Sequence, residues 1–152
     1  MTQIESTFMR DANGVPITNH GLIAKVSRAF TGAAELGAAG ATTLFTVTGS
    51  VIAAIVGVCT ADLTVTGAAT IEVGISGNTA ALVAQTTAST IDGGELWVDG
   101  TPASVVSLPS SKVLTNGTDI IETIATADID GGALTYYCLW NPLSSDGDVV
   151  AA

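Results

Sequence analysis

From residue 42 onward, hydrophobic residues recur in short runs that are separated by polar and glycine-containing turns. The runs are rich in Val, Ile and Thr, and such β-branched residues favour strands. No long stretch shows the 3.6-residue period of an amphipathic helix. The pattern predicts strands at residues 44–48, 51–60, 70–75, 81–85, 95–98, 104–108, 119–126 and 134–140. Many short strands joined by turns are typical of an antiparallel β-sandwich, so we expect an all-β, jelly-roll-like fold.

Glycine-containing pairs mark the turns between these runs, because glycine adopts positive φ without a steric penalty. The strongest of these signals is Asn116-Gly117. Asn-Gly is the preferred pair in two-residue hairpin turns. The sequence therefore predicts a hairpin at this point.

The most hydrophobic segment spans residues 44–63, and its centre, residues 51–58, reads VIAAIVGV. A membrane-spanning helix needs about 20 apolar residues, whereas Gly49-Ser50 interrupts this segment and Asp62 closes it. A continuous apolar run of this length is typical of a strand that is buried on both faces. We therefore expect a doubly buried strand and no contact with a membrane.

Residues 1–40 show little periodicity and contain several turn-forming pairs, so they are interpreted as an extended N-terminal arm. Within this arm, residues 22–30 alternate between apolar and polar positions and could form a first strand. The predicted organisation is an arm at residues 1–40 and a β-sandwich body at residues 41–152. The first residues lack the basic start and apolar run of a secretory signal, so we expect synthesis in the cytoplasm.

The chain of 152 residues is 47% hydrophobic and 12% charged, with a formal net charge of −10. This composition argues against intrinsic disorder, which combines low hydropathy with many charges. The acidic balance would repel phosphates, so direct binding to nucleic acid is not expected.

The few basic residues are unevenly distributed along the chain. Arg10, Lys25 and Arg28 lie in the first 28 residues, and only Lys112 lies beyond them. A mildly basic arm on an acidic body is typical of a protein that binds a partner through the arm. Chance can also produce this distribution in a chain with few lysines. Arg10, Lys25 and Arg28 are therefore candidates for contact with a partner.

Residues that could carry catalysis are scarce. The one histidine, His20, lies in the arm, and the sequence contains neither the Gly-x-Ser-x-Gly motif nor a Walker motif. Acidic turns such as residues 128–132 do not match the twelve-residue calcium loop, and Asp and Gly are common in sheet-end turns anyway. A glycan-cleaving enzyme would need two carboxylates facing each other in a cleft. We expect no enzymatic activity, no metal site and no cofactor.

Cys59 and Cys138 both fall within predicted buried strands. With one distant histidine they do not complete a four-ligand zinc site. A disulfide would form only if their strands are neighbours, and a protein made in the cytoplasm normally keeps its thiols reduced. Free core thiols are the expectation, with the disulfide as the alternative.

Aromatic residues are sparse, but Tyr136 and Trp140 lie together in the last predicted strand and Trp97 lies near a loop. Tyr and Trp contribute strongly to protein interfaces, so these three residues are candidate interface residues. Filling of the core is the alternative.

Several strand and turn segments resemble small virion structural proteins of tailed bacteriophages. They lie at residues 44–49 (LFTVTG), 71–88 (IEVGISGNTAALVAQTTA), 119–123 (DIIET) and 137–144 (YCLWNPLS), and residues 10–17 (RDANGVPI) resemble the N-terminal stretch of such proteins. The resemblance implies that the chain is located in the virion.

In this setting, the expected function is that of a capsid decoration, or cement, protein on the outer surface of the head. Its partners would be the major capsid protein and further copies of the chain, most simply as a trimer at a symmetry point, because oligomerisation also covers strand edges. The alternative is a tail, neck or fibre component that adheres to the host surface.

Overall fold

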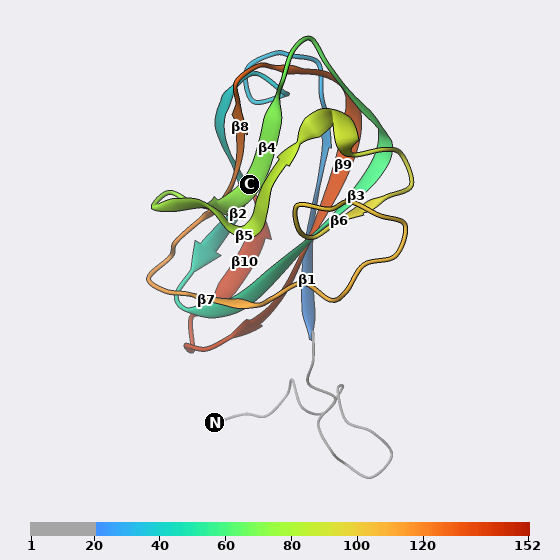
Figure 1. The fold of residues 1–152 in the computed structure, drawn as a ribbon. Helices are drawn as coiled ribbons and strands as arrows, with labels where there is room; N and C mark the ends of the chain where they lie inside the picture. The colour runs from blue at the N-terminus through green and yellow to red at the C-terminus, as the bar shows by residue number, and fades with distance from the viewer. Residues whose placement is uncertain (1–20) are drawn as a thin grey trace.

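A computed structural model describes residues 21–152, which fold into two antiparallel sheets packed face to face (Figure 1). The first sheet has the order β1-β9-β3-β6, with β7 also paired to β3, and the second has the order β10-β2-β8-β4-β5. The elements are β1 (Leu22–Ala29), β2 (Gly40–Thr48), β3 (Val51–Val65), β4 (Thr70–Ile75), β5 (Asn78–Thr87), the short helix η1 (Ala88–Thr90), β6 (Leu96–Trp97), β7 (Lys112–Leu114), β8 (Ile120–Ala125), β9 (Ile129–Pro142) and β10 (Asp148–Ala151).

The strand order is that of a jelly roll. Strands β1 and β9 pair, as do β2 and β8, β3 and β6, and β4 and β5, so the chain follows a long antiparallel ribbon wrapped into two sheets. The last strand, β10, extends the second sheet by pairing with β2. The predicted all-β, jelly-roll-like sandwich is therefore confirmed.

The central pair of the first sheet, β3 and β9, contains the most hydrophobic segment of the sequence. Both strands continue beyond their predicted limits, and Ile55 faces Cys138 across the pair. The register shifts beyond Cys59, where β9 approaches β3 so closely that a Cβ at Gly132 would overlap the carbonyl oxygen of Asp62. No helix in residues 21–152 is long and apolar enough to cross a membrane.

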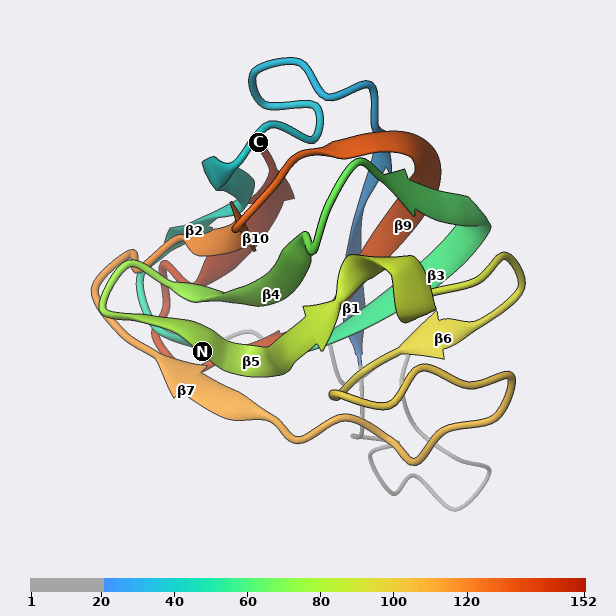
Figure 2. The same ribbon diagram turned by 45° about the horizontal axis from the view of Figure 1, so that its top comes forward.

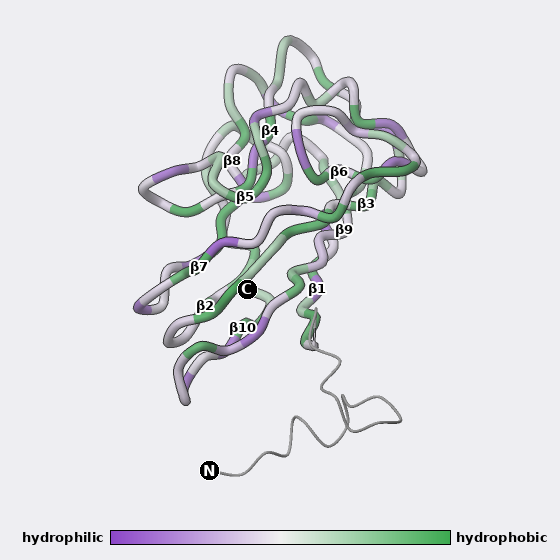
Figure 3. The backbone as a smooth tube through the Cα atoms, turned by 60° about the horizontal axis from the view of Figure 1, so that its bottom comes forward, coloured by the Kyte–Doolittle hydropathy of each residue, from purple (hydrophilic) through white to green (hydrophobic). Residues whose placement is uncertain are grey.

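The core lies between the sheets and is built from alternate residues of each strand. In β8, for example, buried and half-buried residues alternate along the whole strand. Large buried side chains such as Phe45, Ile55 and Leu134 come from both sheets. Hydrophilic segments lie mainly at turns and loops, while long hydrophobic stretches follow the strands (Figure 3).

The possible first strand within the predicted arm forms, and it packs as part of the sandwich. Strand β1 pairs with β9 along its whole length, from Leu22 opposite Trp140 to Ala29 opposite Ala133. The strand predicted at residues 22–30 is thus an integral part of the first sheet. Residues 1–20 of the predicted arm lie outside the described residues.

Two expectations need correction. Asn116 and Gly117 both adopt positive φ, as an Asn-Gly turn requires, but the flanking strands do not form a hairpin. Strand β7 pairs with β3 in one sheet, and β8 pairs with β2 and β4 in the other. Residues 104–108, predicted as a strand, belong to the loop that runs from β6 to β7 (Figure 2).

Candidate functional site

The residues selected from the sequence are distributed between the surface and the interior. Arg10 lies outside the described residues. Lys25 is exposed on β1, with its ammonium nitrogen 5.7 Å from the centre of the Tyr137 ring on β9. A cation at this distance is attracted to the ring face. Lys25 therefore remains a candidate for contact with a partner.

Arg28 bonds within the chain, and its contact with a partner stays a prediction. Its side chain is half-buried and its Nη2 donates a hydrogen bond of 2.8 Å to the carbonyl oxygen of Thr43 on β2. Since Arg28 belongs to the first sheet and Thr43 to the second, this bond joins the two sheets. At least one nitrogen of the guanidinium is therefore used inside the chain.

The three aromatic interface candidates are buried within this single chain. Trp97 and Tyr136 have no exposed surface and Trp140 is 7% exposed. The rings of Trp97 and Tyr136 meet edge to face, with centres 6.3 Å apart. The expectation of an interface is corrected to the alternative: these side chains fill the core.

The buried polar atoms of these aromatic residues form further bonds between the sheets. Trp97 Nε1 on β6 donates to Thr86 Oγ1 on β5 at 2.8 Å. The Tyr136 hydroxyl on β9 donates to the carboxyl group of Glu122 on β8. Buried polar groups are costly unless they are paired, so these bonds favour one relative position of the two sheets.

Glu122 is 1% exposed and lies at the centre of this network. Burial raises the pKa of its carboxyl group, while the hydrogen bond from Tyr136 and the charge of Arg28 act in the opposite direction. Burial and the neighbouring Glu122 carboxyl raise the pKa of the Tyr136 hydroxyl well above its ordinary value. Glu122 was not selected from the sequence, although it sits between the buried residues Ile120 and Ile124 on the inward face of a predicted strand.

Cys59 and Cys138 are free and buried, as expected. They lie on paired strands, but Cys138 faces Ile55, which is four residues and about 13 Å along β3 from Cys59. Disulfide geometry requires Cα atoms within about 7 Å, so the alternative of a bond between them is excluded. Burial raises the pKa of Cys138 to about 12 and also raises the pKa of Cys59. Thiols with raised pKa values are poor nucleophiles.

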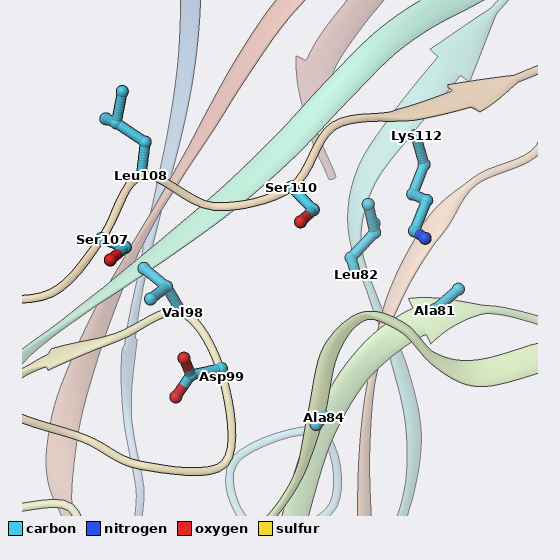
Figure 4. Close-up of a pocket in the computed structure, with 9 residues that line it drawn as sticks. All are labelled: Ala81, Leu82, Ala84, Val98, Asp99, Ser107, Leu108, Ser110 and Lys112. Atoms are coloured by element: carbon cyan, nitrogen blue, oxygen red, sulfur yellow. The ribbon is translucent and has the colours of Figure 1, made fainter.

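Among residues 21–152, no three His, Cys, Asp or Glu side chains are grouped closely enough to hold a metal ion. A groove of about 360 Å³ lies between β5 and the loop that leads to β7 (Figure 4). Two of its lining residues are charged, Asp99 and Lys112. The others are apolar or carry hydroxyl groups: Ala81, Leu82, Ala84, Val98, Ser107, Leu108 and Ser110.

The comparisons with known proteins give one structural match. No protein-family model matches the chain, and no curated protein matches it. A solved structure described as the cyanophage Pam1 capsid asymmetric unit contains a chain with 17% identity and a TM-score of 0.42. The alignment covers 78% of this chain and 81% of that chain. A TM-score this low does not establish a shared fold, so the jelly-roll assignment rests on the strand order described above.

Proposed function

We propose that this chain is a bacteriophage virion structural protein that decorates the outer surface of the head as a homo-oligomer. Its partner in the particle would be the major capsid protein, and its role would be binding rather than catalysis. The observation that carries the proposal is the resemblance of its strand and turn segments to small virion proteins of tailed phages, which extends through most of the sandwich.

The architecture supports this proposal. Jelly rolls occur in viral capsid proteins, although one fold can serve several functions. The side chains of Arg28, Trp97 and Tyr136 all bond across the two sheets, so they stabilise the body. A body fixed in this way suits a component that must present one shape at many equivalent positions.

The segment before β1 is the proposed attachment element. Residues 1–20 carry Arg10 and lead into β1, which lies at one edge of the first sheet and presents Lys25 to solvent. Attachment of each copy of an oligomer through such a segment would be multivalent, so modest individual contacts would suffice.

Copy number in purified virions tests the proposal directly. We expect this chain at a copy number comparable with that of the major capsid protein when both are quantified by mass spectrometry. A few copies per particle would contradict decoration and favour the tail, neck or fibre alternative. Complete absence from virions would overturn the structural role itself.

Deletion of residues 1–20 is expected to abolish binding to heads that lack this protein. The matched control is Lys112→Ala, which removes a basic residue at the groove on the body. The thermal transition of the deletion variant should match that of the full chain, because β1 and its pairing with β9 are retained. Full binding by a folded deletion variant would show that this segment is not the attachment element.

A further inference from the structure

The turn from Thr115 to Thr118 joins the two sheets, because it leads from β7 in the first sheet to β8 in the second. Asn116 and Gly117 are exposed and adopt φ values of 54° and 68°, which lie in the left-handed region. The backbone amide of Gly117 donates a hydrogen bond of 3.0 Å to the carbonyl oxygen of Gly49, in the turn between β2 and β3. The Asn-Gly pair is therefore held by a distant part of the chain.

Further contacts close this turn. The backbone amide of Thr118 donates to the carbonyl oxygen of Thr115 at 3.3 Å, and the Thr118 hydroxyl donates to the same oxygen at 2.6 Å. A Cβ at position 117 would lie 3.0 Å from the carbonyl oxygen of Val47, so the backbone here packs closely against β2. These contacts, together with the bond to the β2–β3 turn, restrain the peptide unit between Asn116 and Gly117.

An asparagine that precedes glycine can react with its own backbone. The backbone nitrogen of Gly117 would attack Cγ of Asn116, so that a C–N bond forms and the side-chain nitrogen leaves as ammonia, which takes the proton of the Gly117 amide. Water then opens the cyclic imide at either carbonyl and gives aspartate or isoaspartate. Glycine has no Cβ that obstructs the ring, and Asn116 is exposed to water. The pair therefore has the chemical requirements for deamidation.

We propose that Asn116 is a deamidation site whose reaction the fold suppresses through the hydrogen bond between Gly117 and Gly49. Ring closure requires the Gly117 nitrogen to lose its proton, and that proton is bound to the Gly49 carbonyl oxygen. Ring closure also requires rotation about the Cα–C bond of Asn116, which brings the nitrogen beside Cγ and takes the residue out of its present conformation. The reaction therefore proceeds when the turn opens, and its rate reports the local stability of this end of the sandwich.

The reaction would change the link between the two sheets. Either product adds a carboxylate to a chain whose net charge is already −10. The isoaspartyl product also adds a methylene group to the main chain, which shifts Gly117 relative to Gly49. The modified turn then cannot re-form the same hydrogen bond. This property belongs to the turn alone and is independent of the function proposed above.

The test compares deamidation of the folded full-length protein in buffer with deamidation of the same chain unfolded in guanidinium chloride, at one pH and temperature. Cleavage after glutamate gives the peptide of residues 96–122, in which Asn116 is the only asparagine, so mass spectrometry measures the reaction at this position. We expect the folded chain to react at least about tenfold more slowly, which corresponds to an opening free energy of about 1.4 kcal/mol. A smaller difference, or no reaction in the unfolded chain, would overturn the proposal.

A second comparison tests the hydrogen bond to Gly49 itself. The hydroxyl oxygen of Ser144 accepts a hydrogen bond of 2.8 Å from the backbone amide of Ser50, the residue after Gly49. Ser144→Ala removes this support and leaves the reacting pair unchanged, so we expect Asn116 to react about two- to tenfold faster, the effect of losing one hydrogen bond. Ser76→Ala makes the same change on the exposed turn between β4 and β5, and it should react at the wild-type rate.

Thermal unfolding reports whether each variant is folded. A folded Ser144→Ala variant that reacts at the wild-type rate would show that the bond to Gly49 does not restrain the reaction, and would overturn the proposal. If Ser144→Ala does not fold, the comparison of the folded and unfolded wild type still decides whether the fold suppresses the reaction.

Discussion

Replacing Trp97 by alanine is expected to lower the free energy of unfolding by about 3–5 kcal/mol, the usual effect of removing a large aromatic side chain from a core. Trp97 has no exposed surface and packs edge to face against Tyr136. The change also leaves Thr86 without the indole that donates to its hydroxyl group. Urea unfolding, followed by circular dichroism, measures the loss.

Two control variants separate packing from hydrogen bonding at this position. Trp97→Phe retains much of the buried ring but removes the indole donor, so it should cost less than Trp97→Ala. Thr86→Val removes the acceptor and leaves the indole nitrogen buried without a partner, with an expected loss of about 1–3 kcal/mol. If Trp97→Ala lowers the free energy of unfolding by less than about 1 kcal/mol, the result would contradict the central place of Trp97 in the core.

The sequence predicted most strands because burial between two sheets leaves a local signal. In β8, buried residues alternate with half-buried ones, and the run at residues 51–58 stays hydrophobic at consecutive positions because it forms the middle of the first sheet. The predicted order of short strands and turns is that of a sandwich, and the structure shows the jelly-roll form of it.

The errors arise where local pattern does not determine pairing. Val105 and Leu108 are 83% and 78% exposed, so the hydrophobic residues between 104 and 108 have no partner strand in the described chain. At Asn116-Gly117 the backbone conformation is the one expected, but whether the next strand returns beside the previous one depends on the opposite sheet. Turn chemistry is local, whereas the choice of partner strand is not.

The same distinction applies to the candidate site residues. Arg28 was selected for its charge, but its role depends on the carbonyl oxygen of Thr43, which another sheet brings within reach. Glu122 was predictable in part, because its position between Ile120 and Ile124 places a carboxyl on an inward face. Its hydrogen bond with Tyr136 depends on how the sheets are stacked, which no local pattern specifies.

The buried Glu122 is expected to make stability depend on pH. Burial raises its pKa above the ordinary value of 4.5, so the folded state holds this proton more tightly than the unfolded state does. Between the two pKa values the folded state therefore binds more protons, and the free energy of unfolding falls as pH rises through that window. Each unit of difference in pKa corresponds to about 1.4 kcal/mol.

Glu122→Gln isolates this contribution because the amide does not titrate but can still accept the hydrogen bond from Tyr136. We expect the free energy of unfolding of the wild type, minus that of Glu122→Gln, to decrease as pH rises above 4.5, measured by urea unfolding at a series of pH values. Tyr136→Phe is the matched variant. It removes the hydrogen bond that lowers the pKa of Glu122, so the pH window should extend further upward. The contrary result is a difference in free energy of unfolding between the wild type and Glu122→Gln that stays constant with pH. It would show that the Glu122 carboxyl has the same pKa in the folded and unfolded states, and hence that it is not buried between the sheets.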